Sequence, residues 1–322
     1  MTKPSAACWL ALACVLLCIA AGARAQEVPE WAYPINPPGP DVPDPPDDLH
    51  SLPGSAVQFS SSQLDDLFTA PDWYPNDHPP LPPLVAHGAP PTVYACGYCH
   101  QPNGFGRPEN ASLAGLPATY IIRQVEAFGS GTRRSSVPDR IPAKFMAELS
   151  GQAARDPGLA EVARYFASIK PKAVIRVVEA EQIPRTEVAG WVLKRADGGE
   201  TEPIGERVVE IPDDFARFEE RDPRLTYTAF VPPGSIARGE ALVKTGAGKT
   251  VGCALCHGAT LRGQDGIPPL AGRSPSYLAR QLYDMQSGAR RDAETAAMKR
   301  VVAKLGNAEM VAITAYLASL PP

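Results

Sequence analysis

A direct internal repeat constrains the fold of this 322-residue chain more than any other feature of its sequence. Shifting the sequence by 157 positions superposes residues 96–134 on residues 253–291 without a gap. Each copy reads Cys-x-x-Cys-His, twelve residues, Leu-Ala-Gly, four residues, Tyr, two residues, Arg-Gln, five residues and Ser-Gly-x-Arg-Arg. A repeat of this length indicates two copies of one structural unit, so we expect two related domains.

The repeated regions also carry the periodicity of helices. Residues 120–128 and 277–285 have apolar side chains three and four positions apart, and a glycine soon follows each stretch. The same spacing marks residues 159–169 and 309–320, near the end of each unit. This spacing is typical of amphipathic helices. The sequence therefore predicts a mainly α fold.

Residues 1–25 have the features of a secretory signal peptide. Lys3 precedes an apolar run at 9–20, and Ala23-Arg24-Ala25 fits a cleavage site before Gln26. The run is shorter than the roughly 20 apolar residues that a membrane span requires. No later stretch is apolar enough to cross a membrane. We therefore expect an exported, periplasmic protein with no membrane span in its mature chain.

Two regions outside the repeat differ from it in composition. Residues 26–85 hold 15 of the 36 prolines and ten acidic side chains without one Lys or Arg, which predicts an irregular extension. Its recurring aromatic residues indicate that it packs along the folded body, where it would shield the basic domains. Residues 171–232 contain short β-branched runs, including 188–194, and a hairpin turn is expected at Asp197-Gly198-Gly199.

These regions divide the chain into a signal peptide (1–25), an acidic proline-rich extension (26–85), a first domain (86–170), a strand-rich connector (171–232) and a second domain (233–322). The first domain carries nine basic and six acidic side chains, the second eleven and six, and the connector nine and thirteen. Basic domains favour acidic protein partners through electrostatic steering. An exported chain with a net charge of −4 is not expected to bind nucleic acid.

All cysteines outside the signal peptide lie in the repeated motif, as Cys96, Cys99, Cys253 and Cys256. A redox Cys-x-x-Cys opens a helix within a strand-helix-strand pattern, which these surroundings do not resemble. A four-cysteine zinc site would leave both following histidines and the repeated flanks unexplained. Haem attachment uses every motif residue, because the thiols bond the haem vinyl groups and the histidine binds iron. The sequence therefore predicts two covalently bound haem c groups.

Each predicted haem needs two axial ligands for its iron. His100 and His257 directly follow the cysteines and are predicted as the proximal ligands. Met146 and Met298 lie 19 and 18 residues before a tyrosine in the closing helices. This near match predicts these methionines as the second ligands.

The register of the first methionine leaves alternatives open. The loop before Met146 is five residues longer than its counterpart. Matching the sequence AELS to AKLG would place Pro142 opposite the second methionine and leave the first iron without one. We prefer Met146 because helix ends set the register better than a short match at a loop edge. His87 is the rival ligand, and Met285 and Met310 are interpreted as core residues.

The order of these motifs resembles the class I cytochrome c fold and, more closely, the dihaem cytochrome c4 family. The resemblance covers about 86–170 and 233–320, with VPPGSIARGEALV as the first helix of the second domain. It implies two class I cytochrome c domains in tandem, a periplasmic location and electron delivery to respiratory partners. The strand-rich connector and the extension depart from that family.

The resemblance also concerns residues other than the ligands. In the family a backbone carbonyl orients the proximal histidine, at the position that corresponds to Pro269 here and to Ser112 in the first copy. Two interpretations apply to four further residues, Tyr120, Tyr277, Arg133 and Arg290. One is that they contact the haem carboxylates, and the other is that they serve helix packing and surface charge.

Two haems with His and Met ligands leave no iron position open for a substrate, so we predict an electron carrier rather than an enzyme. Its partners would be redox proteins, an electron donor and an acceptor, such as a membrane oxidase or a periplasmic dehydrogenase. One alternative is a cytochrome subunit of a larger oxidoreductase. The other is a dihaem peroxidase-like enzyme, which requires one haem without a firm sixth ligand.

Overall fold

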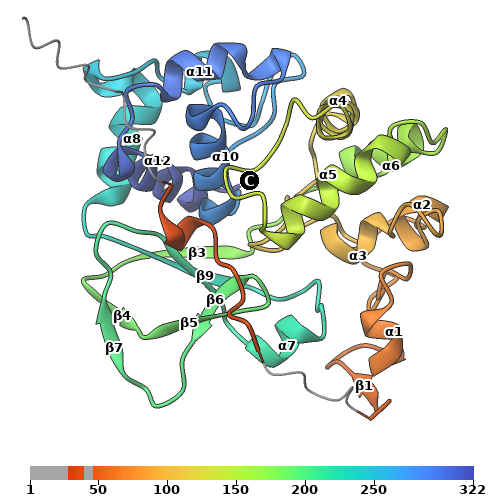
Figure 1. Ribbon diagram of the computed structural model, residues 1–322. Helices are drawn as coiled ribbons and strands as arrows, with labels where there is room; N and C mark the ends of the chain where they lie inside the picture. Colours follow the sequence, from red (N-terminus) through yellow and green to blue (C-terminus); the bar gives the residue numbers. More distant parts are fainter. Residues whose placement is uncertain (1–27, 40–45) are drawn as a thin grey trace, which may run out of the picture.

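The computed structural model describes residues 28–39 and 46–322, and the predicted signal peptide lies outside this part of the chain. Figure 1 shows the C-terminal helices in blue, beside them the helices of the first unit in yellow to green, and the connector strands below. The fold is mainly helical, as the repeat predicts. No single helix of the described residues is long and apolar enough to cross a membrane, although Ala293–Val302 and Asn307–Ser319, bent by 116°, pass that test as a pair.

The second helical unit begins with the helix predicted from VPPGSIARGEALV. Its helices are α8 (Ser235–Thr245), α9 (Ala254–His257), α10 (Pro275–Ser287), α11 (Ala296–Val302) and α12 (Asn307–Ser319), with single 3-10 turns at Gly246–Gly248 and Ala293–Thr295. α8 crosses α12 so closely that a Cβ on Gly239 would overlap the carbonyl oxygen of Ala312. Only glycine fits this crossing. Val243, Tyr283 and Leu317 form the core beside it.

The first helical unit repeats this arrangement without its first helix. Its helices are α3 (Cys96–His100), α4 (Ala118–Gly129), α5 (Ile141–Ala153) and α6 (Leu159–Ser168). Before α3, closely spaced prolines leave only the four-residue helix α2 (Pro83–Ala86). Proline lacks the N–H that a helix needs and clashes with the preceding turn, so a long helix does not form there. Leu84 and Val85 of this segment instead pack against Phe166 of α6.

The connector forms a three-stranded sheet in the order β3 (Ile175–Glu179), β9 (Tyr227–Val231), β8 (Val209–Pro212). β3 and β9 are parallel, with Ile175 opposite Tyr227, whereas β8 is antiparallel to β9. The short helix α7 (Phe215–Glu219) lies between β8 and β9 in the chain. Val231 of β9 packs with Val311 of α12, so the sheet is attached to the second helical unit.

The connector hairpin differs from the prediction. β4 (Gln182–Pro184) pairs with β7 (Thr201–Pro203), and β5 (Thr186–Ala189) pairs with β6 (Val192–Arg195). The turn therefore lies at Gly190-Trp191, whose φ angles of 57° and 66° suit a two-residue hairpin turn. The turn predicted at Asp197-Gly198-Gly199 is wrong. These residues form a bulge in the returning half of the hairpin. Arg185 donates its N–H to the carbonyl oxygen of Glu200, and its carbonyl oxygen accepts from the N–H of Ala196, so the residues between have no partner on the opposite strand.

The extension packs on the rest of the chain, as its aromatic residues predict. It contains η1 (Glu30–Ala32), β1 (Leu49–Ser51), β2 (Gln58–Ser60) and α1 (Ser61–Asp65). The Tyr33 hydroxyl donates to Asp284 Oδ1 of α10 at 2.8 Å. The fully buried Trp73 donates its Nε1–H to the carbonyl oxygen of Glu220 in the connector at 2.7 Å. The extension thus contacts both the second unit and the connector.

His78 of the extension gives the fold a pH dependence. Its ring bonds Asp72 Oδ1 at 3.1 Å and the carbonyl oxygen of Pro79 at 2.8 Å. Burial lowers the pKa of His78, but these acceptors outweigh burial and raise the pKa above its usual 6.5. The resulting stabilisation is fully present below about pH 6.5 and is lost as the pH rises through the folded-state pKa.

We therefore expect the urea midpoint to fall less in H78Q than in the wild type as the pH rises from about 6 to about 8.5. Circular dichroism at each pH measures this midpoint. The matched control is H87Q, because it makes the same substitution at a histidine that is exposed. Equal pH dependence in H78Q and the wild type would contradict the assignment.

Candidate functional site

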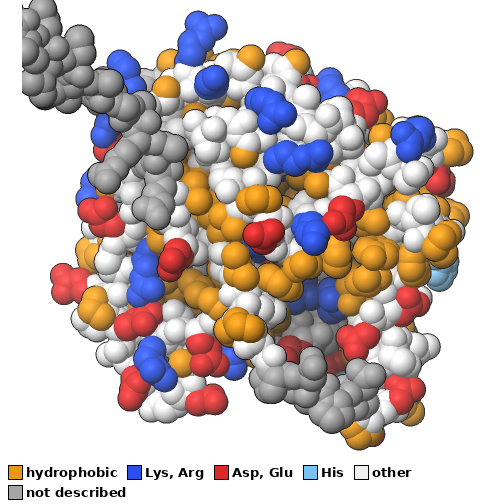
Figure 2. Space-filling view, viewed as in Figure 1, with side chains coloured by type: hydrophobic (Ala, Val, Ile, Leu, Met, Phe, Trp, Pro, Cys, Tyr) orange, Lys and Arg blue, Asp and Glu red, His pale blue; other side chains and the backbone are white. Residues whose placement is uncertain are grey.

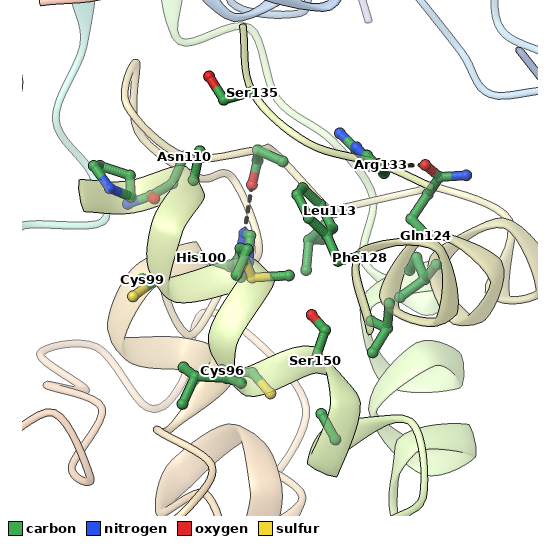
Figure 3. A pocket seen from close by; sticks show the side chains of 18 of the residues that line it. Cys96, Cys99, His100, Asn110, Leu113, Gln124, Phe128, Arg133, Ser135 and Ser150 are labelled. Carbon is green, nitrogen blue, oxygen red and sulfur yellow. Dashed lines mark hydrogen bonds between the residues drawn. The ribbon is translucent and has the colours of Figure 1, made fainter. Parts of the chain in front are cut away.

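The first repeated motif lies in the wall of an apolar cavity of about 170 Å³. Cys96, Cys99 and His100 of α3 all line it, as Figure 3 shows. His100 Nδ1 lies 2.8 Å from the carbonyl oxygen of Ala111, and burial lowers the pKa of His100. A neutral ring whose Nδ1 is bonded to a carbonyl has Nε2 left to bind a metal ion.

The second motif repeats this geometry in a cavity of about 410 Å³. Cys253, which caps the N-terminus of α9, and Cys256 and His257 within the helix line this cavity. His257 Nδ1 lies 2.8 Å from the carbonyl oxygen of Pro268, and burial lowers the pKa of His257. The two motifs therefore hold their histidines in the same way, as the repeat predicts.

The carbonyls that orient the histidines are one residue earlier than the resemblance implied. Ala111 and Pro268 are the equivalent acceptors in the two repeats, whereas Pro269 and Ser112 were expected. Successive carbonyls along a loop point in different directions, so a shift of one residue changes which group faces the ring. The carbonyl of Ser112 accepts instead from Arg273 Nη1 at 3.3 Å.

Each cavity has a predicted methionine in its wall. Met146 lies on α5 and lines the first cavity, and Met298 lies on α11 and lines the second. α5 begins at Ile141, so the longer loop ends before the helix that carries Met146. Aligning the two copies by their closing helices therefore selects, in both units, a methionine that lines the same cavity as the motif histidine.

The alternatives to these methionines have different positions. Pro142 lines the first cavity but has no atom that could bind iron, and the exposed His87 is not among the residues that line it. Met310 is fully buried in the core of the second unit, as predicted. Met285 is also buried, and it lies in the wall of the second cavity. The first cavity contains no methionine other than Met146 among its described lining residues.

The cysteines are not arranged for thiol redox chemistry or for zinc. Burial raises the pKa of Cys96 to about 12 and that of Cys253 to about 11, which disfavours the thiolate that redox exchange and zinc binding require. The two pairs line separate cavities. Within residues 28–39 and 46–322, no three His, Cys, Asp or Glu side chains are placed to hold a metal ion. An apolar cavity with a cysteine pair, an oriented histidine and a methionine fits a haem c instead.

The two cavities meet where α4 and α10 approach each other. Four residues line both cavities, namely Leu116, Tyr120, Tyr277 and Gln281. The arginine of the repeated Arg-Gln pair lines the cavity of the opposite unit. Arg280 of the second repeat lines the first cavity, and Arg123 of the first repeat lines the second. Each unit therefore contributes a helix to the cavity of the other.

Arg133 and Arg290, which are equivalent in the repeat, exchange hydrogen bonds across this junction. Arg133 donates Nη2–H to Tyr277 Oη at 3.0 Å and to Gln281 Oε1 at 2.8 Å. Arg290 makes the equivalent bonds to a tyrosine and a glutamine of the first repeat, at 3.1 and 2.9 Å. Both arginines are buried, and their backbones form an antiparallel bridge. Packing between the units is thus shown for these residues, and each guanidinium also lines a cavity.

Arg140 is a site residue that sequence reasoning missed. It ends the longer loop, lines the first cavity and donates Nη2–H to the carbonyl oxygen of Trp191 in the connector turn at 2.9 Å. Burial lowers the pKa of Arg140 to about 9. An arginine in a loop resembles a surface residue in the sequence, and the five extra residues of the loop were the available signal.

Comparisons with known proteins bear on what binds in these cavities. The cytochrome c family profile matches residues 236–321, which cover the second helical unit. Cytochrome c4 of Azotobacter vinelandii is 27% identical over 231 residues, which are 70% of this chain and 84% of that protein. The chain is a distant homologue of cytochrome c4. Its second helical unit matches the cytochrome c family and, with two motifs in two cavities, the chain has sites for two haem c groups.

The chain is also similar to proteins whose names contain thiosulfate dehydrogenase. The thiosulfate dehydrogenase electron acceptor of Thiomonas intermedia (strain K12) is 24% identical over 239 residues, or 72% of this chain and 82% of that protein. A solved structure of thiosulfate dehydrogenase from Marichromatium purpuratum is 26% identical, with a TM-score of 0.49. The similarity covers 74% of this chain and 39% of that one.

Proposed function

We propose that this cytochrome c is a periplasmic dihaem electron carrier in which His100 and Met146 bind the first iron and His257 and Met298 bind the second. The observation that carries the proposal is that each cavity is lined by one motif histidine and by the predicted methionine, Met146 or Met298, from a different helix. In the second cavity Met285 of α10 lines the wall as well. Export to the periplasm rests on the features of residues 1–25.

The chain's own residues prepare the sites for electron transfer. The four cysteines would anchor the haems through thioether bonds, and the carbonyls of Ala111 and Pro268 hold the histidine rings in one orientation. A bound haem supplies an iron that changes oxidation state by one electron. The apolar walls exclude water, and Met146 and Met298 would bind the irons and so leave no position for a substrate. This arrangement supports electron transfer rather than catalysis.

A second candidate function is the cytochrome subunit of a larger oxidoreductase. One observation favours it, since a relative that this chain matches over 82% of that relative's length is named an electron acceptor of thiosulfate dehydrogenase. The donor would then be a dehydrogenase and the acceptor a further redox protein, such as a membrane oxidase. Co-purification from native cells at low salt separates the two candidates, because a subunit elutes with its dehydrogenase and a free carrier elutes alone.

The peroxidase alternative loses its support. It depended on a register that leaves the first iron without methionine, whereas Met146 lines the first cavity. Met146 bound to the first iron would leave a peroxide no place to bind.

The near-infrared spectrum of the oxidised protein tests the proposed ligands. We expect a methionine-to-iron charge-transfer band with the intensity of two haems per chain, because both cavities supply a methionine. The haem content of the same sample, from the pyridine haemochrome spectrum, is the reference. A band with the intensity of only one haem would remove one of the two ligand pairs and revive the peroxidase alternative.

A further inference from the structure

The two haem motifs differ sharply in exposure although they are equivalent in the repeat. Tyr98, between the first pair of cysteines, is 5% exposed, whereas the equivalent Leu255 is 72% exposed. Cys256 is exposed, but its counterpart Cys99 is partly buried. Val251, two residues before the second motif, is 46% exposed. The second motif therefore presents an apolar surface to solvent, and the first does not.

The extension covers the first motif from one side. A Cβ on Gly97 would lie 2.8 Å from the carbonyl oxygen of Val85 and 2.9 Å from Cβ of Ala70, so both residues press directly on α3. Leu67 packs into the same small cluster as Tyr98. Figure 1 places α1 and α2 of the extension next to α3.

The connector covers the first motif from another side. The guanidinium of Arg221 lies over the Tyr98 ring at 3.6 Å from its centroid and donates Nη1–H to the Tyr98 carbonyl oxygen at 3.2 Å. Asn103, just after the motif, donates its side-chain N–H to the carbonyl oxygen of Pro223 at 2.8 Å. The two regions that have no counterpart in the repeat thus form one cap over the first motif, consisting of residues 67–85 and 221–223.

From this asymmetry we infer that the chain exchanges electrons with its partners through the surface around Cys256 alone, and that this surface docks a redox protein with an acidic contact face and an apolar centre. The inference rests on the proposed electron-carrier function. A haem bonded to Cys256 has that edge at the protein surface, whereas a haem bonded to Cys99 lies under the cap. The first haem then exchanges electrons through the second, across the junction at which both cavities share residues.

The chemistry of the partner follows from the charges beside this surface. The Thr250 hydroxyl donates to the carbonyl oxygen of Val301 at 2.5 Å, which places Val251 next to the end of α11. Lys299 and Arg300 on α11 and Lys304 after it are exposed. Figure 2 shows Lys and Arg side chains over the upper part of the molecule, where Figure 1 places α11. An apolar centre beside exposed cations complements an acidic rim around an apolar patch.

A kinetic test compares two charge reversals of equal size. One variant carries Lys299→Glu and Arg300→Glu, and its matched control carries Arg164→Glu and Lys170→Glu, which are exposed cations of the first unit. The reduced dihaem protein is mixed with ferricyanide, an anionic one-electron oxidant, in a stopped-flow spectrometer at low salt. We expect the oxidation rate of both haems to fall about tenfold in the first variant and less than about twofold in the control. Tris(phenanthroline)cobalt(III), a cationic one-electron oxidant, should show the opposite change in the first variant.

The amplitudes of this experiment decide the inference. If half of the haem absorbance keeps the wild-type rate in the Lys299→Glu, Arg300→Glu variant, the first haem exchanges electrons directly and the inference is overturned. An equal loss of rate in the control variant overturns it as well. Salt should remove the effect, since screening weakens contacts between exposed charges.

A second test needs no electron transfer. A neutral gadolinium chelate broadens the proton signals of groups that it can approach, so it should broaden the haem methyl signals of the oxidised second haem and spare those of the first. Leu255→Tyr, which places the first motif's residue in the second, assigns the signals because it shifts those of the second haem. Equal broadening of both haems would show that the cap does not cover the first. The near-infrared band intensity tests the ligands separately, so failure of the proposed function is distinguishable from failure of this inference.

Discussion

Replacing Met298 with Leu is expected to remove half of the methionine-to-iron band and to let carbon monoxide bind one reduced haem. Leucine has a similar volume but no sulfur, so the fold tolerates the change while the iron loses its sixth ligand. The loss of a thioether ligand lowers the reduction potential, and the expected shift is on the order of 0.1 V or more. Spectra under carbon monoxide and a potentiometric titration measure both effects.

Met146→Leu should give the same result at the first haem, where the register was open in the sequence. Met310→Leu is the matched control, because Met310 is fully buried in the core and does not line either cavity. The control should keep the full band and both potentials. A full band in Met146→Leu would show that the first iron has another ligand.

Replacing Arg133 with Met is expected to lower the free energy of unfolding by about 3 kcal/mol. The change keeps an unbranched side chain in place but removes a buried guanidinium that donates to Gln124 and Gln281 at 2.7 and 2.8 Å and to Tyr277 at 3.0 Å. Both glutamine oxygens keep Arg290 as a donor, at 2.9 and 3.1 Å, so the expected cost comes from the lost hydrogen bonds of a buried charged donor. Urea unfolding followed by circular dichroism measures the loss.

The neighbouring Arg134 provides the control for this prediction. It is exposed and donates to the carbonyl oxygen of Phe128 at 2.8 Å. Arg134→Met should change the unfolding free energy by less than about 1 kcal/mol. Similar losses in both variants would mean that the junction contributes little and that the charge change itself destabilises the chain.

The haem motifs could be predicted from the sequence because their geometry is local. Cys96, Cys99 and His100 lie within one five-residue helix, so their relative positions follow from the helix alone. The helices of both units could be predicted for the same reason, since the apolar spacing shows which face of each is buried. The position of Met146 was harder, because it depends on how a loop of uncertain register returns the chain to the cavity.

The connector shows why other features could not be predicted. The parallel pairing of β3 with β9 joins residues about fifty positions apart, and no local pattern encodes such a contact. The hairpin turn at Gly190-Trp191 places a large residue at positive φ. Its Trp191 N–H donates to Asn36 Oδ1 of the extension at 2.9 Å, a contact between distant segments that supports the turn.

By itself, the sequence determined that this chain has two equivalent haem motifs, because the repeat and the local geometry of a helical Cys-x-x-Cys-His require nothing from the rest of the fold. Only the tertiary structure decided that the two motifs are not equivalent in their surroundings. Exposure depends on what packs over a residue, and the segments over Tyr98 come from regions without repeat counterparts. Among residues 28–39 and 46–322 no segment covers Leu255 in this way, and it remains 72% exposed.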